Sequence, residues 1–502
     1  MDGEWHRLHP ATPLLRGGIA LIVILGIVVG NLRDTLIQLV VGGGERGPED
    51  PLSLIYERGL TGIVLAAIAL GLIAFIVGFY FSWRMHSFRI TAELVEVRSG
   101  IFYRTNRKGR LDRIQGINIA RPFFARLFGA AKLEVNVAGQ DANVQLAYLS
   151  SANADALRKE ILRLASGTQA AASPTPVAAG GLVDRRVAEL LAPELDPDAA
   201  PPASVVNLHL GRLIGSLVLS GFTIFLLVLV VGTVVIISVT HELFFLVTFA
   251  APIIGMGSYY FRKFTKSLRY SIAGTPDGVR VGFGLLSTSN ETLPPGRIHS
   301  VQVSQPLLWR PAGWWEIRVN LASKSSNNGA ASQANTSILP VGNLADVKKV
   351  LELVLPGLVD ERSIDLIERG LTSRGGDDGF VNSPRRAWII RWFSWRRNGF
   401  AIEPDAVLLR SGAVWRSLVI VPQARMQSVA MHQGPLLRRL GLASIIVHTV
   451  AGPIQPRLGA VDRDAAIGFF TDVSAAAVLS SARDTSHRWR SGEGRSNGEV
   501  TA

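Results

Sequence analysis

The segment Ser99-Gly100-Ile101 is followed first by Arg113-Ile114-Gln115 and then by Arg126-Leu127-Phe128-Gly129. From Gly100 to Arg113 is 13 residues, and from Arg113 to Gly129 is 16. A Gly behind a run of alternating apolar residues suits a hairpin turn, because positive φ costs Gly little. This stretch therefore indicates a strand, a tight turn and a second strand.

Two further stretches keep the same register. The signature residues of the second copy are Gly284, Arg297 and Gly313, and those of the third are Gly412, Arg425 and Gly441. Both copies repeat the separations of 13 and 16 residues. Identical spacing at three places predicts three copies of one domain, here called modules one, two and three.

Each module combines strands with a closing helix. Apolar and polar residues alternate at 133–137, at 317–321 and at 445–449, which is typical of half-buried strands. Helical runs follow at 154–164, 344–353 and 462–479. The pattern predicts a small β-barrel or sandwich capped by a C-terminal helix.

Four apolar stretches accompany the modules, at 11–30, 60–83, 213–240 and 243–261. About 20 apolar residues cross a bilayer core, so we expect four transmembrane helices in two hairpins and an α+β membrane protein. Basic residues gather behind the second and fourth stretches. They predict a multi-pass protein of the bacterial cytoplasmic membrane, with its N-terminus, modules and C-terminus in the cytoplasm.

Composition divides the chain further. Segments rich in Ala, Pro, Gly and Asp suggest linkers, and a polar, Gly-rich end suggests a disordered tail. The expected order is hairpin one, module one, a linker, hairpin two, module two, a second linker, an interfacial helix with module three, and the tail. The boundaries are 1–83, 84–165, 166–203, 204–261, 262–356, 357–384, 385–480 and 481–502.

The chain resembles the YdbT-like bacterial membrane proteins, which are built from bacterial Pleckstrin-homology (PH) domains. The resemblance lies in Arg7-Leu8-His9-Pro10, in the two apolar hairpins and in the triplicated signature. It implies a seven-stranded PH-like fold with a C-terminal helix. The family has no well-defined biochemical activity, so the resemblance implies a fold more than a function.

Net charge and aromatic residues suggest where a membrane is touched. The chain carries a formal charge of +13, which suits an anionic bilayer. We expect two contact regions, the basic stretch Arg104, Arg107, Lys108 and Arg110, and a helix with Trp388, Trp392, Trp395, Arg396 and Arg397. The alternatives are a solvated loop and an aromatic stripe that packs on its own module. The recurring arginines either bind lipid headgroups or bond to nearby carbonyls.

Catalytic chemistry finds little support in the sequence. The chain has no Cys, and its nine His are scattered without metal-site spacing. No motif of an acyl-transfer or zinc hydrolase occurs, and we expect no enzyme activity, no cofactor and no metal.

We therefore interpret the chain as a non-enzymatic membrane scaffold whose modules bind lipid headgroups or a membrane protein partner. Envelope maintenance or tolerance of membrane-active peptides is a possible process. The expected partners are anionic lipids and a shorter protein with a single PH-like module, and no nucleic acid. The alternative function is a component of a lipid or peptide transport assembly.

Overall fold

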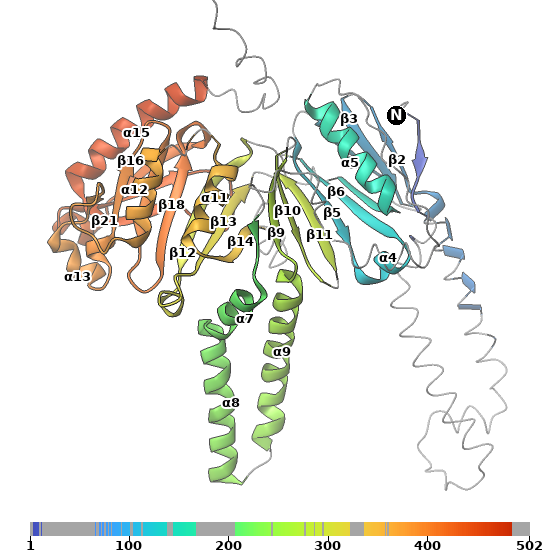
Figure 1. Ribbon diagram of the computed structural model, residues 1–502, viewed down its shortest axis with the longest axis horizontal. Helices are drawn as coiled ribbons and strands as arrows, with labels where there is room; N and C mark the ends of the chain where they lie inside the picture. The colour runs from blue at the N-terminus through green and yellow to red at the C-terminus, as the bar shows by residue number, and fades with distance from the viewer. Residues whose placement is uncertain are drawn as a thin grey trace, which may run out of the picture.

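The computed structural model describes residues 4–9 and 12, scattered positions between 66 and 81, and most of 83–166, 206–321 and 336–483. Short gaps in these ranges include 101–103, 112–113 and 138–143. Three modules lie side by side in a row, and a helical hairpin projects from one side of the row (Figure 1).

Module one begins with a strand that lies far ahead of the others in sequence. His6–Arg7 (β1) pairs with β2 across some 80 residues of chain. The helix α5 closes the module. The elements are β2 (Ser87–Ile90), β3 (Leu94–Ser99), β4 (Thr105–Arg110), β5 (Ile114–Arg121), α4 (Phe123–Leu127), β6 (Ala130–Val137), β7 (Val144–Ser150) and α5 (Ser151–Ser166).

Module two repeats this plan, with a helical hairpin inserted between its first two strands. The insert comprises α7 (Leu210–Val218), α8 (Gly221–Thr240) and α9 (Phe244–Ser267). The helix α11 closes the module. The other elements are β8 (Val206–Asn207), β9 (Ser271–Thr275), β10 (Gly278–Phe283), β11 (Thr288–Leu293), β12 (Ile298–Gln305), η4 (Leu307–Trp309), β13 (Trp315–Leu321), β14 (Ser337–Gly342) and α11 (Leu344–Val354).

Module three carries a short irregular insert where module two has its hairpin. The insert is η6 (Arg385–Ala387), α13 (Trp388–Arg391) and η7 (Trp395–Arg397). Ahead of the module, α12 (Glu361–Thr372) lies in the segment that the sequence marks as a linker. The other elements are β15 (Val381–Asn382), β16 (Gly399–Ile402), β17 (Ala406–Ser411), β18 (Arg416–Pro422), η8 (Gln423–Arg425), β19 (Ser428–His432), α14 (Pro435–Arg439), β20 (Leu442–His448), β21 (Arg457–Asp462) and α15 (Arg463–Arg483).

The prediction of four transmembrane helices in two hairpins is wrong. In the part of the chain that the structure describes, two helices are long and apolar enough to cross a membrane, α8 and α15. Of these, α15 buries Ala466, Phe469 and Val473 against module three, as the capping helix of that module. Of the four predicted stretches, 213–240 contains one of the two helices, α8, whereas α15 lies where the sequence predicts the closing helix of module three. Apart from Thr12, the stretch 11–30 lies outside the described residues, as does most of 60–83.

The sheets of neighbouring modules are continuous. Strand β11 of module two pairs antiparallel with β5 of module one, which gives a seven-stranded sheet in the order β7-β6-β5-β11-β10-β9-β8. Strand β18 of module three pairs in the same way with β12 of module two, in the order β14-β13-β12-β18-β17-β16-β15. Each junction thus satisfies the backbone groups of two strands that would otherwise be sheet edges.

The alternating segments form the central strands as predicted. In β6 the side chains of Leu133, Val135 and Val137 are buried, and they meet the apolar face of α5. The core of module two also extends into module three, where it includes Leu408 and Leu418. The side chains of modules two and three therefore pack into one apolar body.

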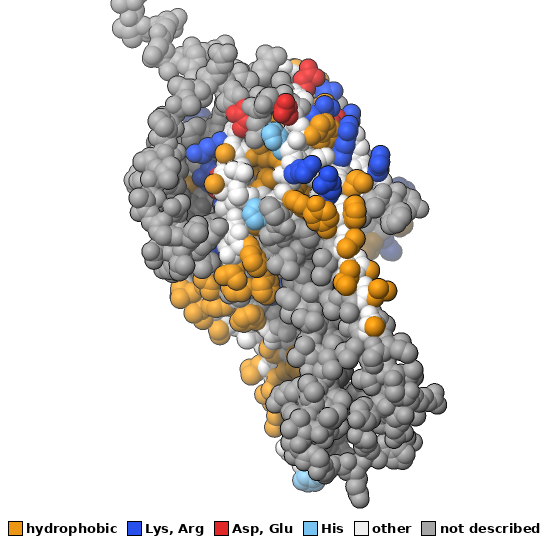
Figure 2. Space-filling model, turned by 90° about the vertical axis from the view of Figure 1, so that its right-hand side faces the viewer, with side chains coloured by type: hydrophobic (Ala, Val, Ile, Leu, Met, Phe, Trp, Pro, Cys, Tyr) orange, Lys and Arg blue, Asp and Glu red, His pale blue; other side chains and the backbone are white. Residues whose placement is uncertain are grey.

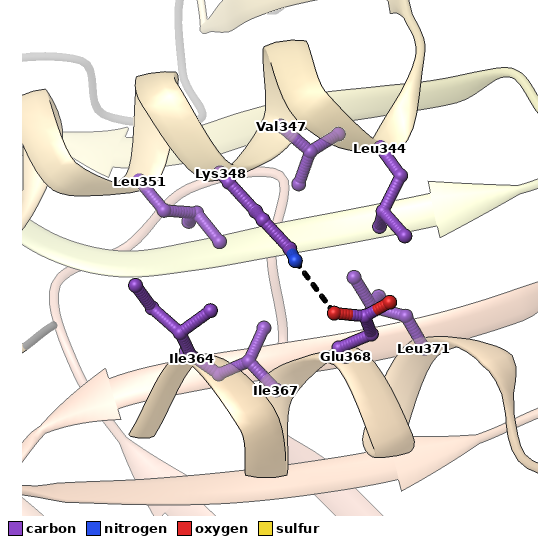
Figure 3. A pocket seen from close by; sticks show the side chains of 8 residues that line it. All are labelled: Leu344, Val347, Lys348, Leu351, Ile364, Ile367, Glu368 and Leu371. Atoms are coloured by element: carbon purple, nitrogen blue, oxygen red, sulfur yellow. Dashed lines mark ion pairs between the residues drawn. The ribbon is translucent and has the colours of Figure 1, made fainter. Parts of the chain in front are cut away.

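Helix α12 covers part of this shared core and packs beside α11. Leu366, Ile367 and Leu371 of α12 are buried. On the outer side, the ammonium of Lys348 lies 2.6 Å from a carboxylate oxygen of Glu368, above the apolar side chains that line the gap between the helices (Figure 3). Because this ion pair is partly exposed, we expect the buried leucines to supply most of the attachment.

The signature glycines are explained by the turns that they make. Gly100, Gly284 and Gly412 have φ values of 106°, 104° and 81°. A Cβ at Gly284 would lie 2.0 Å from the carbonyl oxygen of Ser287, and one at Gly412 would lie 1.7 Å from that of Trp415. Only Gly fits such a turn, which is why the sequence repeats it.

One buried ion pair ties α12 and the first strands of module three together. The guanidinium of Arg410 is fully buried and bonds to Asp378, to the side chain of Asn382 at 2.6 Å and to the carbonyl of Arg397 at 3.1 Å. Burial raises the pKa of Asp378, but hydrogen bonds from Arg410 and Ser373 outweigh it and lower the pKa overall.

We expect Arg410→Met to cost about 3–5 kcal/mol of unfolding free energy, because it leaves a buried carboxylate without its cation. Chemical denaturation of the full chain measures the loss. The double variant Arg410→Met with Asp378→Leu should recover much of it, and a double variant as unstable as the single one would contradict this account.

Stability should also depend on pH through His299, at the junction of modules two and three. Burial lowers its pKa to about 4 from an ordinary 6.5, a hydrogen bond with the backbone of Arg425 opposes this, and the charges of Arg425 and Arg297 add to it. Between pH 6.5 and 4 the unfolded chain takes up a proton that the folded chain does not. The free energy of unfolding should therefore fall as pH drops through this range, by at most about 3 kcal/mol before solvent screening.

Denaturation curves at pH 7.5 and 5 measure this loss. His299→Gln removes the titrating group, so its unfolding free energy should change less between the two pH values than that of the unaltered chain. Equal pH dependence in both proteins would show that other groups are responsible.

Candidate functional site

A cavity of about 650 Å³ lies where modules two and three meet. Its walls come from the end of β12, from η4 and the loop behind it, from the loop after α12, from η7 and from the β17–β18 turn. The lining residues are Gln305, Arg310, Gly313, Trp315, Leu344, Thr372, Arg374, Phe393, Arg396, Arg397, Ala413 and Arg416.

Five of these residues are arginines, and none of the described residues that line the cavity carries a carboxylate. They differ in accessibility: Arg374 and Arg396 are exposed, Arg310 and Arg416 are half-buried, and Arg397 is buried. The exposed guanidiniums are positioned to receive an anion, because Arg presents planar, forked donors that match phosphate and carboxylate groups.

The two deeper arginines hold the walls together. Arg397 donates to the carbonyls of Gly370 and Leu371 at 2.7 and 2.8 Å, and to that of Ser411 at 3.1 Å. Arg310 donates across the junction to the carbonyls of Ala413 and, at 3.1 Å, Val414. Both therefore fix the β17–β18 turn, which forms one wall of the cavity.

The cluster is electrostatically unfavourable without an anion. Burial lowers the pKa of Arg397 to about 9, the nearby Arg410, Arg416 and Arg310 lower it further, and Asp378 opposes them. Burial also lowers the pKa of Arg416, and repulsion from Arg310 and Arg374 adds to this effect. An anion in the cavity would relieve this repulsion, and no described acidic side chain lines the cavity to do so.

A glycine permits the close approach that forms the cavity. Gly375 has a φ of 101°, and a Cβ there would lie 1.9 Å from the carbonyl oxygen of Arg396. The loop after α12 can therefore lie directly against η7. This contact brings Arg374 and Arg396 to the same opening.

Exposed aromatic side chains lie on α13 and directly after it, where Phe393 lines the cavity and its ring centroid is 3.9 Å from that of Trp392. Trp388 is 57% exposed, Trp392 64% and Phe393 67%, whereas Trp395 packs against the module beside Ala387 and Leu442. The sequence predicted one helical face that carries all three Trp. The helix is limited to Trp388–Arg391, so the chain turns before Trp395 and separates it from the other two.

A second exposed apolar group lies on module one. The side chains of Phe123, Phe124, Leu127 and Phe128 are each more than two-fifths exposed. Helices α4 and α13 both lie on the lower side of the row of modules, the side from which α8 and α9 project (Figure 1). Apolar side chains also gather near the middle of the face in Figure 2, below a group of Lys and Arg side chains.

The basic stretch of module one forms the strand β4. Lys108 lies 2.8 Å from Glu96 in the neighbouring strand, and Arg89 in the next strand lies 2.7 Å from the same carboxylate. The hydrogen bond from Lys108 is the largest cause that lowers the pKa of Glu96. Lys108 is thus ion-paired within its own sheet, although its side chain is exposed, as are those of Arg104, Arg107 and Arg110.

The recurring arginines have different surroundings. Arg113 lies outside the described residues, and Arg297 and Arg425 are half-buried. Arg126 is buried and donates to the carbonyl of Leu285 at 3.2 Å, as Arg310 does to the carbonyl of Ala413. The acceptor belongs to the next module, which sequence reasoning missed, because no sequence signal shows that two modules share a junction.

Comparison with known proteins agrees with the threefold division. A family model for the bacterial PH domain matches residues 23–165, 214–356 and 379–477. No curated protein matches the chain significantly. PH domains are generally binding modules without catalytic activity, and no enzyme family is indicated.

We expect the side chain at position 392 to enter an apolar environment when the chain is in a bilayer. Because the chain has no Cys, Trp392→Cys provides a single site for a polarity-sensitive label. Its emission should shift to shorter wavelength on transfer from detergent to proteoliposomes that contain bromolipid, with strong quenching. A label at Asp365→Cys, on exposed α12, serves as the control, and equal quenching at both sites would contradict membrane contact at α13.

Proposed function

We propose that this chain, which belongs to the bacterial PH domain family, is a non-enzymatic scaffold. It holds its three PH modules against a membrane and binds anionic lipid headgroups. The observation that supports this most strongly is the arginine-lined cavity beside exposed aromatic side chains. A phospholipid presents the matching chemistry, since its phosphate carries negative charge and its chains are apolar.

The cavity supports headgroup binding through its charge balance. Arg374 and Arg396 stand at the opening, and Arg416 deeper in the cavity is repelled by Arg310 and Arg374. A phosphate would accept hydrogen bonds from the two exposed guanidiniums and reduce the repulsion. A neutral headgroup would lack this effect, so the cavity should discriminate by charge.

The apolar side chains support a membrane position for the same face. Trp and Phe side chains suit the boundary between headgroups and acyl chains. Helix α8 is 20 residues long with a mean hydropathy of 3.0, and it projects on the same side as α4 and α13. We propose that α8 enters the bilayer and that α4 and α13 touch its surface.

The order of the helices and modules along the chain supports a more specific assignment of protein class and membrane orientation. We infer a YdbT-like protein of the bacterial cytoplasmic membrane, with the modules on the cytoplasmic side, from the basic residues at 262–269, in the last turns of α9 and directly after it. Envelope maintenance is the cellular process that we favour for such a scaffold, with a lipid surface or a shorter protein with a single PH module as its partners.

Binding of lipid to the full chain in a neutral detergent tests the proposal. We expect a short-chain phosphatidylglycerol to raise the melting temperature by several degrees, and a short-chain phosphatidylcholine to have little effect. The double variant Arg374→Gln with Arg396→Gln should lose most of the response to the anionic lipid, because it removes the two exposed cations.

The control variant carries Arg439→Gln and Arg463→Gln, two exposed cations that do not line the cavity. It loses the same charge and should keep the response. If both double variants respond equally, the cavity is not the lipid site. If inorganic phosphate alone gives the full response, the site recognises a soluble anion and not a lipid.

A further inference from the structure

We propose that this chain associates head to tail with a second copy of itself, with β19 of one copy pairing with β4 of the next. The inference goes beyond the proposed function and does not depend on lipid binding. It follows from a comparison of the two internal junctions with the two ends of the row of modules.

Both internal junctions use equivalent strands in the same register. From Gly100 to Gly284 is 184 residues, and from Gly284 to Gly412 is 128. At the first junction Asn118 pairs with Glu291. Adding 184 to position 118 gives Gln302, and adding 128 to position 291 gives Val419. Gln302 and Val419 are paired at the second junction. The junction is therefore a repeated interface with one geometry.

Side chains reinforce that geometry at equivalent positions. At the first junction the hydroxyl of Ser289 donates to the amide oxygen of Asn118 at 2.7 Å. At the second, the amide of Gln302 donates to the hydroxyl of Ser417 at 2.8 Å. The arginine contacts described above are equivalent too, with Arg126 on the carbonyl of Leu285 and Arg310 on that of Ala413.

The two ends of the row carry the same strands without their partners. Strand β4 corresponds to β11 and β18, and β19 corresponds to β5 and β12, yet β4 and β19 are edge strands of the described sheets. The residues of β11 are almost all buried, whereas those of β4 are almost all exposed. Likewise β12 is mostly buried and β19 mostly exposed.

The corresponding arginine of module three, beside the unpaired edge of β19, is exposed as well. Arg438 is the counterpart of Arg126 and Arg310, and it occupies the same position relative to the signature glycine. Its backbone carbonyl accepts a hydrogen bond from Gly441, as those of Arg126 and Arg310 do from Gly129 and Gly313. Arg126 is 4% exposed and Arg310 half-buried, but Arg438 is exposed, as expected for an arginine whose junction is not formed within one chain.

The repeated register predicts the contacts between two copies. By the same offsets, Ala430 of one copy faces Arg107 of the next, and Met431 faces Asn106. Thr105 keeps the hydroxyl that Ser289 and Ser417 supply, but Ala430 lacks the amide of Asn118 and Gln302. The positively charged side chains of β4 also disfavour a strand pairing that excludes water. The contact between copies should therefore be weaker than the internal junctions and reversible.

Disulfide trapping tests the register directly, since the chain has no Cys of its own. Two separately tagged full-length chains, one with Arg107→Cys and one with Ala430→Cys, are co-expressed and oxidised in membranes. A second mixture pairs Asn106→Cys with Met431→Cys. Neighbouring antiparallel pairs alternate between about 5.5 and 4.5 Å Cα separation, so at least one mixture should give a cross-linked dimer carrying both tags.

The control mixture pairs Arg110→Cys with Ala430→Cys, three residues out of register, and should cross-link at least tenfold less. Failure of both in-register mixtures, when all the Cys react with maleimide, would overturn the proposal. So would equal cross-linking in the control, or a disulfide to a different protein in place of the second copy, which would identify β19 or β4 as the site of a separate partner.

A variant that should strengthen the association gives a test that a misfolded protein could not pass. Ala430→Gln restores the amide of the internal junctions and should shift the full chain from monomer to higher oligomers at lower concentration, by about threefold or more. Arg438→Ala should shift it in the opposite direction, and Arg439→Ala should not. An unchanged oligomer distribution in detergent for Ala430→Gln and Arg438→Ala would also contradict head-to-tail association.

Discussion

The exposed edge of a β-sheet is the constraint on which this architecture depends. An edge strand presents backbone donors and acceptors that must bond to water or to another strand. In this chain β5 and β12 meet that requirement by pairing with β11 and β18 of the following module. The pairing fixes the distance and direction between modules, which a flexible linker alone would leave open.

Side-chain packing makes the second junction more than a strand contact. Apolar residues of module three belong to the same core as those of module two, and α12 covers both. The buried pair of Arg410 and Asp378 then ties the covering loop to the sheet beneath it. Modules two and three therefore share one packed core, and the cavity lies at their junction.

Arginine serves two purposes at this junction, and burial separates them. Arg310 and Arg397 use their guanidiniums to bind carbonyls and to set the shape of the turn. Arg374 and Arg396 are exposed at the opening, where the same chemistry is available to an external anion. The repulsion among these arginines would be reduced by a phosphate, so their structural and binding roles are coupled.

Sequence by itself determined the repeat, the strand and cap pattern of each module and the positions of the signature glycines. These depend on local alternation and on backbone angles that only Gly adopts easily, so the residues report them directly. Sequence also marked Arg396 and the exposed Trp388 and Trp392 as residues of interest.

Tertiary structure alone decided which strands pair between modules, where Arg126 and Arg310 find their acceptors and which arginines share a cavity. It also corrected the number of candidate spans, because two helices of the described residues, α8 and α15, are long and apolar enough to cross a membrane, and α15 packs against module three. The contacts of Arg126 and Arg310 join residues more than 100 positions apart, and no local pattern encodes the partner of an edge strand.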